Sequence, residues 1–80
     1  MVILKKKSIS KDKITYYYQP EGTGDCGVVS YIPSTGDCII EKMSDREHEN
    51  FFMYRSKAFW CMKKFVEENE YPETKTVMWG

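Results

Sequence analysis

Residues 23–40 read TGDCGVVSYIPSTGDCII, and this stretch contains the tetrapeptide Thr-Gly-Asp-Cys twice. A short run with β-branched residues follows each copy. Glycine enters the left-handed region at little cost, and aspartate hydrogen-bonds to neighbouring backbone, so each copy is typical of a hairpin turn. The repeat therefore predicts an antiparallel meander and does not by itself indicate a binding site.

On either side of the repeat, runs rich in strand-forming residues predict strands at residues 2–8, 14–19, 27–32 and 37–43. The turn at residues 33–36 fits a type I turn that Gly36 closes as a bulge. This turn predicts a register in which Ile32 faces Cys38 and Tyr31 faces Ile39.

In that register both faces of the sheet carry apolar side chains. One face holds Val28, Ile32, Cys38 and Ile40, and the other holds Val29, Tyr31, Ile39 and Met43. A single helix covers only one face. We therefore expect the other face to meet the N-terminal segment, the C-terminal tail or a second subunit.

One long helix follows the meander. Ser44 and Glu47 have the spacing of a capping box, which predicts a helix that begins after Ser44 and ends near Asn69, before Pro72. Its apolar stripe contains Phe51, Tyr54, Ala58, Cys61, Met62 and Phe65. Arg55 falls inside this stripe, so we expect its guanidinium to pair or to reach solvent.

These elements predict one α+β domain over residues 1–80. It has an antiparallel β-meander of three to four strands, one long α-helix packed on a sheet face, and a C-terminal extended segment. Residues 74–79 alternate weakly between polar and apolar side chains, so they either add an edge strand or lie across the helix.

Composition narrows the class of protein. The 80 residues include 12 basic and 12 acidic side chains, which is typical of a folded domain rather than a disordered one. So small a core leaves little stability, and dimerisation would add to it. The chain shows no signal peptide and no apolar run long enough to span a membrane, and its three cysteines are an odd number. We expect a cytoplasmic protein with free thiols.

The residue inventory does not favour catalysis, a cofactor or a metal. The metal-binding candidates are Cys26, Cys38, Cys61 and His48, and no two cysteines have a common zinc spacing. His48 is expected on the helix surface, where nothing forces a thiol beside it. Asp25 and Asp37 belong to turns at opposite ends of one hairpin, so they do not form a catalytic pair. We expect a protein that is not an enzyme.

The leading hypothesis is a protein-interaction or homodimerising module. Its predicted surface is the apolar line of Met53 and Trp60 on the basic side of the helix, with Lys57 and Lys64 beside it. Trp60 has three alternatives here: it rests against the tail around Trp79, it forms part of a self-interface, or it contacts a foreign partner.

The alternative hypothesis is single-stranded nucleic-acid binding. Its predicted surface combines a basic N-terminal hairpin with the tyrosines of residues 16–18, and the residues concerned are Lys6, Lys7, Tyr16 and Tyr17. Aromatic rings beside cationic grooves stack bases in such proteins. The pI of about 6.6 for the whole chain argues against this function.

Overall fold

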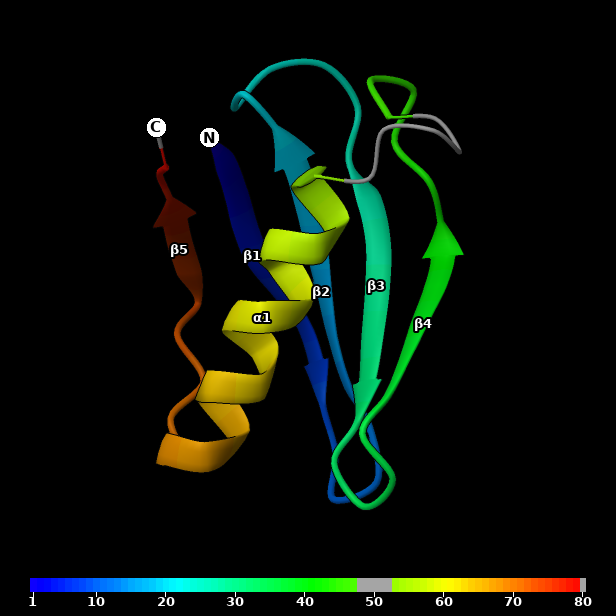
Figure 1. Ribbon diagram of the computed structural model, residues 1–80, viewed down its shortest axis with the longest axis vertical. Helices are drawn as coiled ribbons and strands as arrows, with labels where there is room; N and C mark the ends of the chain where they lie inside the picture. Colours follow the sequence, from blue (N-terminus) through cyan, green and yellow to red (C-terminus); the bar gives the residue numbers. More distant parts are fainter. Residues whose placement is uncertain (48–52, 80) are drawn as a thin grey trace.

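The computed structural model describes residues 1–47 and 53–79. The alternating N-terminal runs form four strands in succession, the helix follows them, and the tail forms a fifth strand (Figure 1). The elements are β1 (Val2–Ile9), β2 (Ile14–Pro20), β3 (Gly27–Ile32), β4 (Asp37–Lys42), α1 (Met53–Glu68) and β5 (Thr74–Val77).

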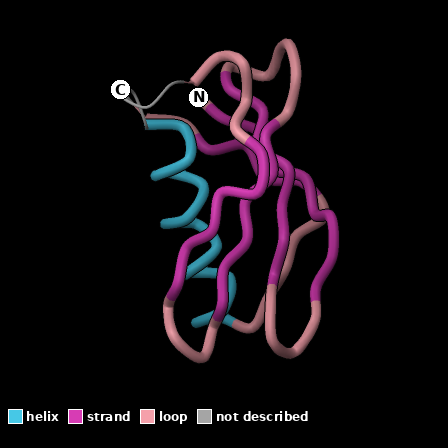
Figure 2. Tube along the Cα trace, turned by 90° about the vertical axis from the view of Figure 1, so that its right-hand side faces the viewer, coloured by secondary structure: helices cyan, strands magenta, loops and turns pink. Residues whose placement is uncertain are grey.

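The strands form one antiparallel sheet in the order β4-β3-β2-β1-β5. The helix α1 lies on one side of this sheet and packs against β1, β2 and β3 (Figure 2). The predicted α+β meander with a single packed helix is confirmed. The tail takes the first of its two predicted positions, because β5 pairs with β1 and becomes an edge strand.

The core lies between α1 and the three strands below it. Alternate side chains of each strand point to the helix, as the two-residue period requires. The buried apolar residues are Val2, Leu4, Ile14, Tyr16, Tyr18, Val29, Tyr31, Ala58, Cys61, Met62, Phe65 and Val77. The apolar helix stripe is thus confirmed where it is described, and Phe51 lies outside the described residues.

The predicted register between the last two meander strands is wrong by one residue. Ile32 pairs with Asp37 and Tyr31 pairs with Cys38. The loop between them has four residues, because the N–H groups of Thr35 and Gly36 both bond to the carbonyl of Ile32. The irregularity in the ladder lies away from the turn, between Val28 and Val29.

This shift changes the face on which the β4 side chains lie, because a one-residue slip inverts a strand. Cys38 and Ile40 lie on the helix side, and Ile39 lies on the opposite side, next to Ser30. The predicted grouping of these residues by face is therefore wrong. The N-terminal segment and the tail join the sheet edge to edge, so within the described residues neither of them covers the second face.

Ser44 does not cap the helix α1, which begins at Met53. The Ser44 hydroxyl and the Asp45 N–H bond to the carboxylate of Asp25, and the Glu47 N–H bonds to the Ser44 carbonyl. Ser44 thus belongs to a turn that Asp25 holds. The capping pattern was a local signal, and this long-range contact outweighs it.

Glu47 is buried and still acts at the helix start. One carboxylate oxygen accepts the Tyr18 hydroxyl at 2.7 Å, and the other accepts the backbone N–H of Arg55 at 2.9 Å. The Arg55 guanidinium lies 3.5 Å from the same carboxylate, so the expected pairing of Arg55 is confirmed. A carboxylate near a helix N-terminus also interacts favourably with the helix dipole.

The helix ends in a left-handed residue. Asn69 has a φ of 53°. The N–H of Glu70 bonds to the carbonyl of Phe65, and the N–H of Asn69 bonds to the carbonyl of Val66. These are the two bonds of a Schellman motif. The chain then turns through Pro72 toward β5, close to the predicted end of the helix.

Gly36 has a φ of 80° and open space around the position of a Cβ, since the nearest atom would be 3.9 Å away. Gly36→Val should therefore lower the free energy of unfolding by more than about 1 kcal/mol through backbone strain alone. Gly36→Asn should cost less, because asparagine tolerates the left-handed region. Chemical denaturation measures both. Equal losses would contradict the assigned role of φ.

Removing the Glu47 carboxylate should leave the Tyr18 hydroxyl and the Arg55 guanidinium without their buried acceptor. We expect Glu47→Ala to lower the free energy of unfolding by about 3 kcal/mol. The control is Asp45→Ala, which removes an exposed carboxylate two residues away and should stay within about 0.5 kcal/mol of wild type. Similar denaturation midpoints for the two variants would show that Glu47 does not anchor the helix.

Candidate interaction groove

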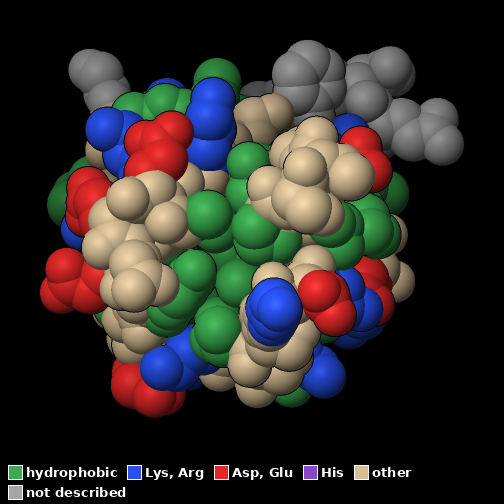
Figure 3. All heavy atoms as spheres, turned by 90° about the horizontal axis from the view of Figure 1, so that it is seen from below, with side chains coloured by type: hydrophobic (Ala, Val, Ile, Leu, Met, Phe, Trp, Pro, Cys, Tyr) green, Lys and Arg blue, Asp and Glu red, His purple; other side chains and the backbone are tan. Residues whose placement is uncertain are grey.

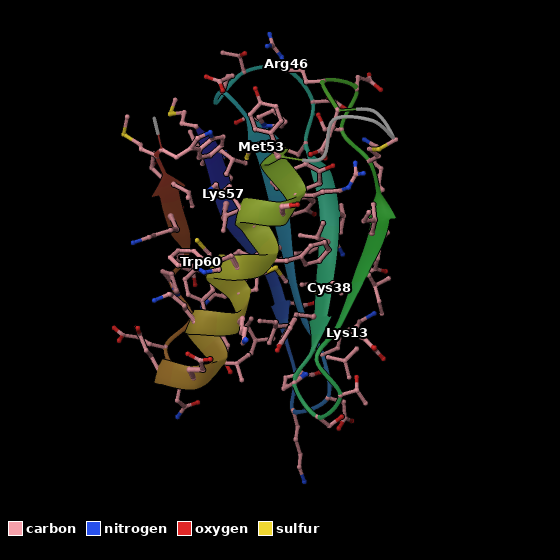
Figure 4. All side chains as sticks on the ribbon, viewed as in Figure 1. Lys13, Cys38, Arg46, Met53, Lys57 and Trp60 are labelled. Atoms are coloured by element: carbon pink, nitrogen blue, oxygen red, sulfur yellow. The ribbon has the colours of Figure 1, made fainter. Side chains whose placement is uncertain are left out.

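The predicted interaction residues lie along α1 and are partly exposed. Met53 is at the first turn, and Trp60 lies seven residues later with 56% of its surface exposed. Figure 4 shows Lys57 and Trp60 on the side of α1 that faces β5, whereas Cys38 lies on the other side, over β3 and β4. Lys57 and Trp60 thus lie on the β5 side of the helix.

The structure pairs these residues in two groups. The Lys64 ammonium lies 4.6 Å from the centre of the Trp60 ring, and the Lys57 ammonium lies 5.6 Å from the Trp79 ring. Trp79 packs edge-on against Tyr54 at 5.9 Å. The tail tryptophan thus packs on the first turn of the helix and leaves Trp60 largely exposed.

Two adjoining hollows lie along the second half of α1, and one of them is beside Trp60. One has a volume of about 260 Å³ and is lined by Trp60, Cys61, Lys64, Phe65, Glu68 and Lys75. The second has a volume of about 230 Å³ and is lined by Phe65, Glu68, Glu70, Pro72 and Lys75. They share three lining residues, so together they form one depression, which we call the α1/β5 groove.

Charge is divided along the α1/β5 groove. Lys64 lies at the Trp60 end, Glu70 lies toward Pro72, and Glu68 and Lys75 border both hollows. Trp60, Cys61 and Phe65 supply the apolar part of the lining. An apolar floor with a charged rim is the usual composition of a protein-interaction surface. The lower end of the molecule also carries hydrophobic side chains at its middle with charged ones around them (Figure 3).

Tyr16 supports the floor and one end of the groove. Its ring lies 5.3 Å from the ring of Phe65, and its hydroxyl bonds to the carbonyl of Pro72 at 2.7 Å. Burial raises the pKa of Tyr16 to about 12, so the hydroxyl remains a donor at neutral pH. Lys6 bonds to the carbonyl of Tyr71 and forms an ion pair with Glu73. Both residues hold the segment that leads into β5.

The predicted nucleic-acid surface does not assemble. Lys6 and Tyr16 pair on the helix side, where Tyr16 is fully buried. Lys7 and Tyr17 lie on the opposite side, with the ammonium 6.0 Å from the ring centre. A base cannot stack on a buried ring, so the four residues do not form one binding platform.

The cysteines and acids of the described residues do not form a metal-binding group. Among the residues that the structure describes, no three of the types His, Cys, Asp and Glu are grouped to hold a metal. His48 lies outside that part of the chain. The thiols of Cys26, Cys38 and Cys61 are free. Burial raises the pKa of Cys61, which outweighs the opposite effect of Lys75, so this thiol is not an activated nucleophile.

Comparison of the chain with protein-family models, with curated proteins and with solved structures finds no match. In residues 1–47 and 53–79 there is no helix with the length and apolar character that a membrane crossing requires. The interpretation of the groove therefore rests on its own geometry.

The residues that complete the groove are not indicated by the sequence; they are Phe65 at its floor and Glu68, Glu70, Pro72 and Lys75 at its rim. Lys75 becomes part of it because β5 pairs with β1 in a register that sets Lys75 opposite Leu4, on the helix side. The weak alternation of residues 74–79 is the one signal in the sequence that points to this arrangement.

Trp60 should contribute little to folding. Because more than half of its surface is exposed, we expect Trp60→Ala to change the free energy of unfolding by no more than about 0.5 kcal/mol. The matched control is Phe65→Ala, one turn further along the helix, which should cost about 3–5 kcal/mol because Phe65 is buried. Thermal denaturation tests both. A large loss for Trp60→Ala would mean that it belongs to the core.

Proposed function

We propose that this protein is a small non-enzymatic interaction module of the cytoplasm that forms a homodimer through β4. The observation that carries this proposal is the exposure of all six residues of this edge strand. Three free thiols support a reducing compartment. The absence of a grouped reactive centre in the described residues supports a binding role rather than a catalytic one.

The middle of β4 lacks the protection that natural edge strands usually carry. Ile39 and Ile40 are 40% and 44% exposed, and they lie on opposite faces of the sheet. Charges, prolines and bulges normally discourage pairing at an edge; here the charged residues stand at the two ends of the strand, and the irregularity between Ile40 and Lys42 lies at one of these ends. An added strand would pair with the free backbone groups and cover both isoleucines.

A second copy of the chain suits this edge because its charges are self-complementary. Asp37 stands at one end of β4 and Lys42 at the other, both on the face away from the helix. Antiparallel pairing of two β4 strands brings Asp37 of each copy toward Lys42 of the other. Glu41 is turned toward Ser30 and Lys13, which reduces its repulsion of Asp37.

The symmetry of such a dimer follows from the strand direction. Antiparallel pairing of identical edges requires a two-fold axis perpendicular to the sheet, which is the closed arrangement common in homodimers. The two sheets then form one continuous ten-stranded sheet, with both helices on the same side. Cys38 and Ile40, exposed beside α1 in one copy, would form the floor between the two helices.

Replacing Ile40 by lysine tests this edge. Wild-type protein should sediment at twice the 9.5 kDa mass of one chain at micromolar concentration, and Ile40→Lys should weaken the dimer by at least about tenfold. The matched control is Ile9→Lys, since Ile9 is 37% exposed on β1. It should leave the dimer unchanged.

Trp60→Ala distinguishes the β4 edge from the helix surface that the sequence predicts. Trp60 faces β5, at the opposite edge of the sheet from β4 (Figure 4). This variant should therefore dimerise like wild type. The proposal fails if wild type has the mass of one chain at all concentrations up to about 1 mM. It also fails if Trp60→Ala, rather than Ile40→Lys, dissociates the dimer.

A further inference from the structure

We propose that the α1/β5 groove binds an extended peptide strand, which pairs with β5 and places a large apolar side chain between Trp60 and Phe65. This inference is independent of the β4 dimer, because the two edges lie at opposite ends of the sheet. It assigns a use to the tryptophan that folding leaves exposed.

The outer edge of β5 offers backbone hydrogen bonds. β5 is the terminal strand of the sheet, and in the described part of the chain its strand partner is β1 on the inner side. Its outward N–H and C=O groups can therefore accept another strand about 4.8 Å away. Addition of a strand to an exposed edge is a common mode of peptide recognition.

The groove gives such a strand a place for every second side chain. Lys75 and Val77 point to the helix side of β5, since they pair with Leu4 and Val2 of the core. Side chains of an added strand alternate in the same way, so those on the helix side enter the gap in front of α1. One of them meets the hollow of about 260 Å³ that Trp60, Cys61 and Phe65 line.

Trp60 has the features of a binding anchor. It is large and more than half exposed, and it lines a hollow together with Cys61 and Phe65 rather than standing on a flat surface. Tryptophan is enriched among the residues that contribute most to protein binding. Lys64 lies over its ring and keeps a positive charge at this end of the groove.

The charges of the groove favour a particular order in the peptide. Lys64 lines only the hollow at the Trp60 end, Glu70 lines only the hollow at the Pro72 end, and Glu68 and Lys75 line both. β5 runs away from the Pro72 end of the groove. An antiparallel peptide therefore runs toward Pro72, and its N-terminal part lies near Trp60. Antiparallel pairing is slightly more stable per residue than parallel pairing. The fitting peptide therefore carries an acidic residue, then an apolar one, then a basic one, at alternate positions.

A second copy of β5 fits this edge poorly. Symmetric antiparallel pairing of Thr74–Val77 with itself brings two Lys75 side chains onto the same face, about 5–8 Å apart. Like charges at that distance oppose association. A foreign strand with an acidic side chain is therefore the better occupant.

The test uses a synthetic peptide, acetyl-Ser-Glu-Thr-Phe-Thr-Lys-Ser-amide, with a fluorescent label. We expect saturable binding with a dissociation constant below about 1 mM by fluorescence anisotropy. Replacing the peptide Phe by Ala, or exchanging its Glu and Lys, should weaken binding by at least about tenfold. Absence of saturable binding overturns the proposal, and equal binding of the charge-exchanged peptide overturns the charge recognition.

Protein variants locate the binding. Trp60→Ala should weaken the peptide complex by about tenfold, and the matched control Met78→Ala, also an exposed apolar residue, should not. Amide hydrogen exchange should slow at residues 74–77 when peptide is added. Slowing at residues 37–42 instead would overturn the proposal. Ile40→Lys should still bind the peptide, so failure of the dimer and failure of the groove are distinguishable.

Discussion

The buried carboxylate of Glu47 determines where the helix lies on the sheet. It accepts the Tyr18 hydroxyl from β2 and the Arg55 N–H from the first turn of α1, so one acid joins the middle of the sheet to the start of the helix. A buried charge is costly unless all of its bonds are made, so alternative positions of the helix that break these bonds are excluded. Burial and the Glu47 bond raise the pKa of Tyr18, which keeps its hydroxyl a donor.

Tyr16 holds the C-terminal end of the helix in place, and Tyr18 holds its start through Glu47. The two tyrosines are alternate residues of β2 and point to the same side. Tyr16 packs on Phe65 and binds the carbonyl of Pro72, so it fixes the chain between α1 and β5. With both ends held, α1 lies over β1, β2 and β3, and it leaves the apolar residues of β4 exposed and a groove in front of β5.

Local patterns predicted the elements, and long-range contacts decided their details. Alternation and turn residues were enough for the four strands, and the apolar stripe was enough for the buried side of the helix. The predicted register of β3 and β4 is wrong because the hairpin loop has four residues. The irregularity in this ladder lies at Val28, at the end away from the loop. The predicted helix start is wrong because the Ser44 hydroxyl bonds to the carboxylate of Asp25, almost 20 residues away. The groove depends on how β5 docks beside α1, which no local pattern records.

The two proposed contacts use opposite edges of one sheet, so they can be made at the same time. In the proposed dimer the two-fold axis lies at β4, which places the two α1/β5 grooves at the outer ends of the ten-stranded sheet. Both grooves open on the helix side, because a perpendicular axis preserves the faces. A partner that carries two suitable strands, spaced to reach both ends, would bind the second at a high effective concentration. Dimerisation would then raise affinity without changing a single contact in either groove, so an Ile40→Lys monomer would lose avidity for that partner while its affinity for the single peptide stays the same.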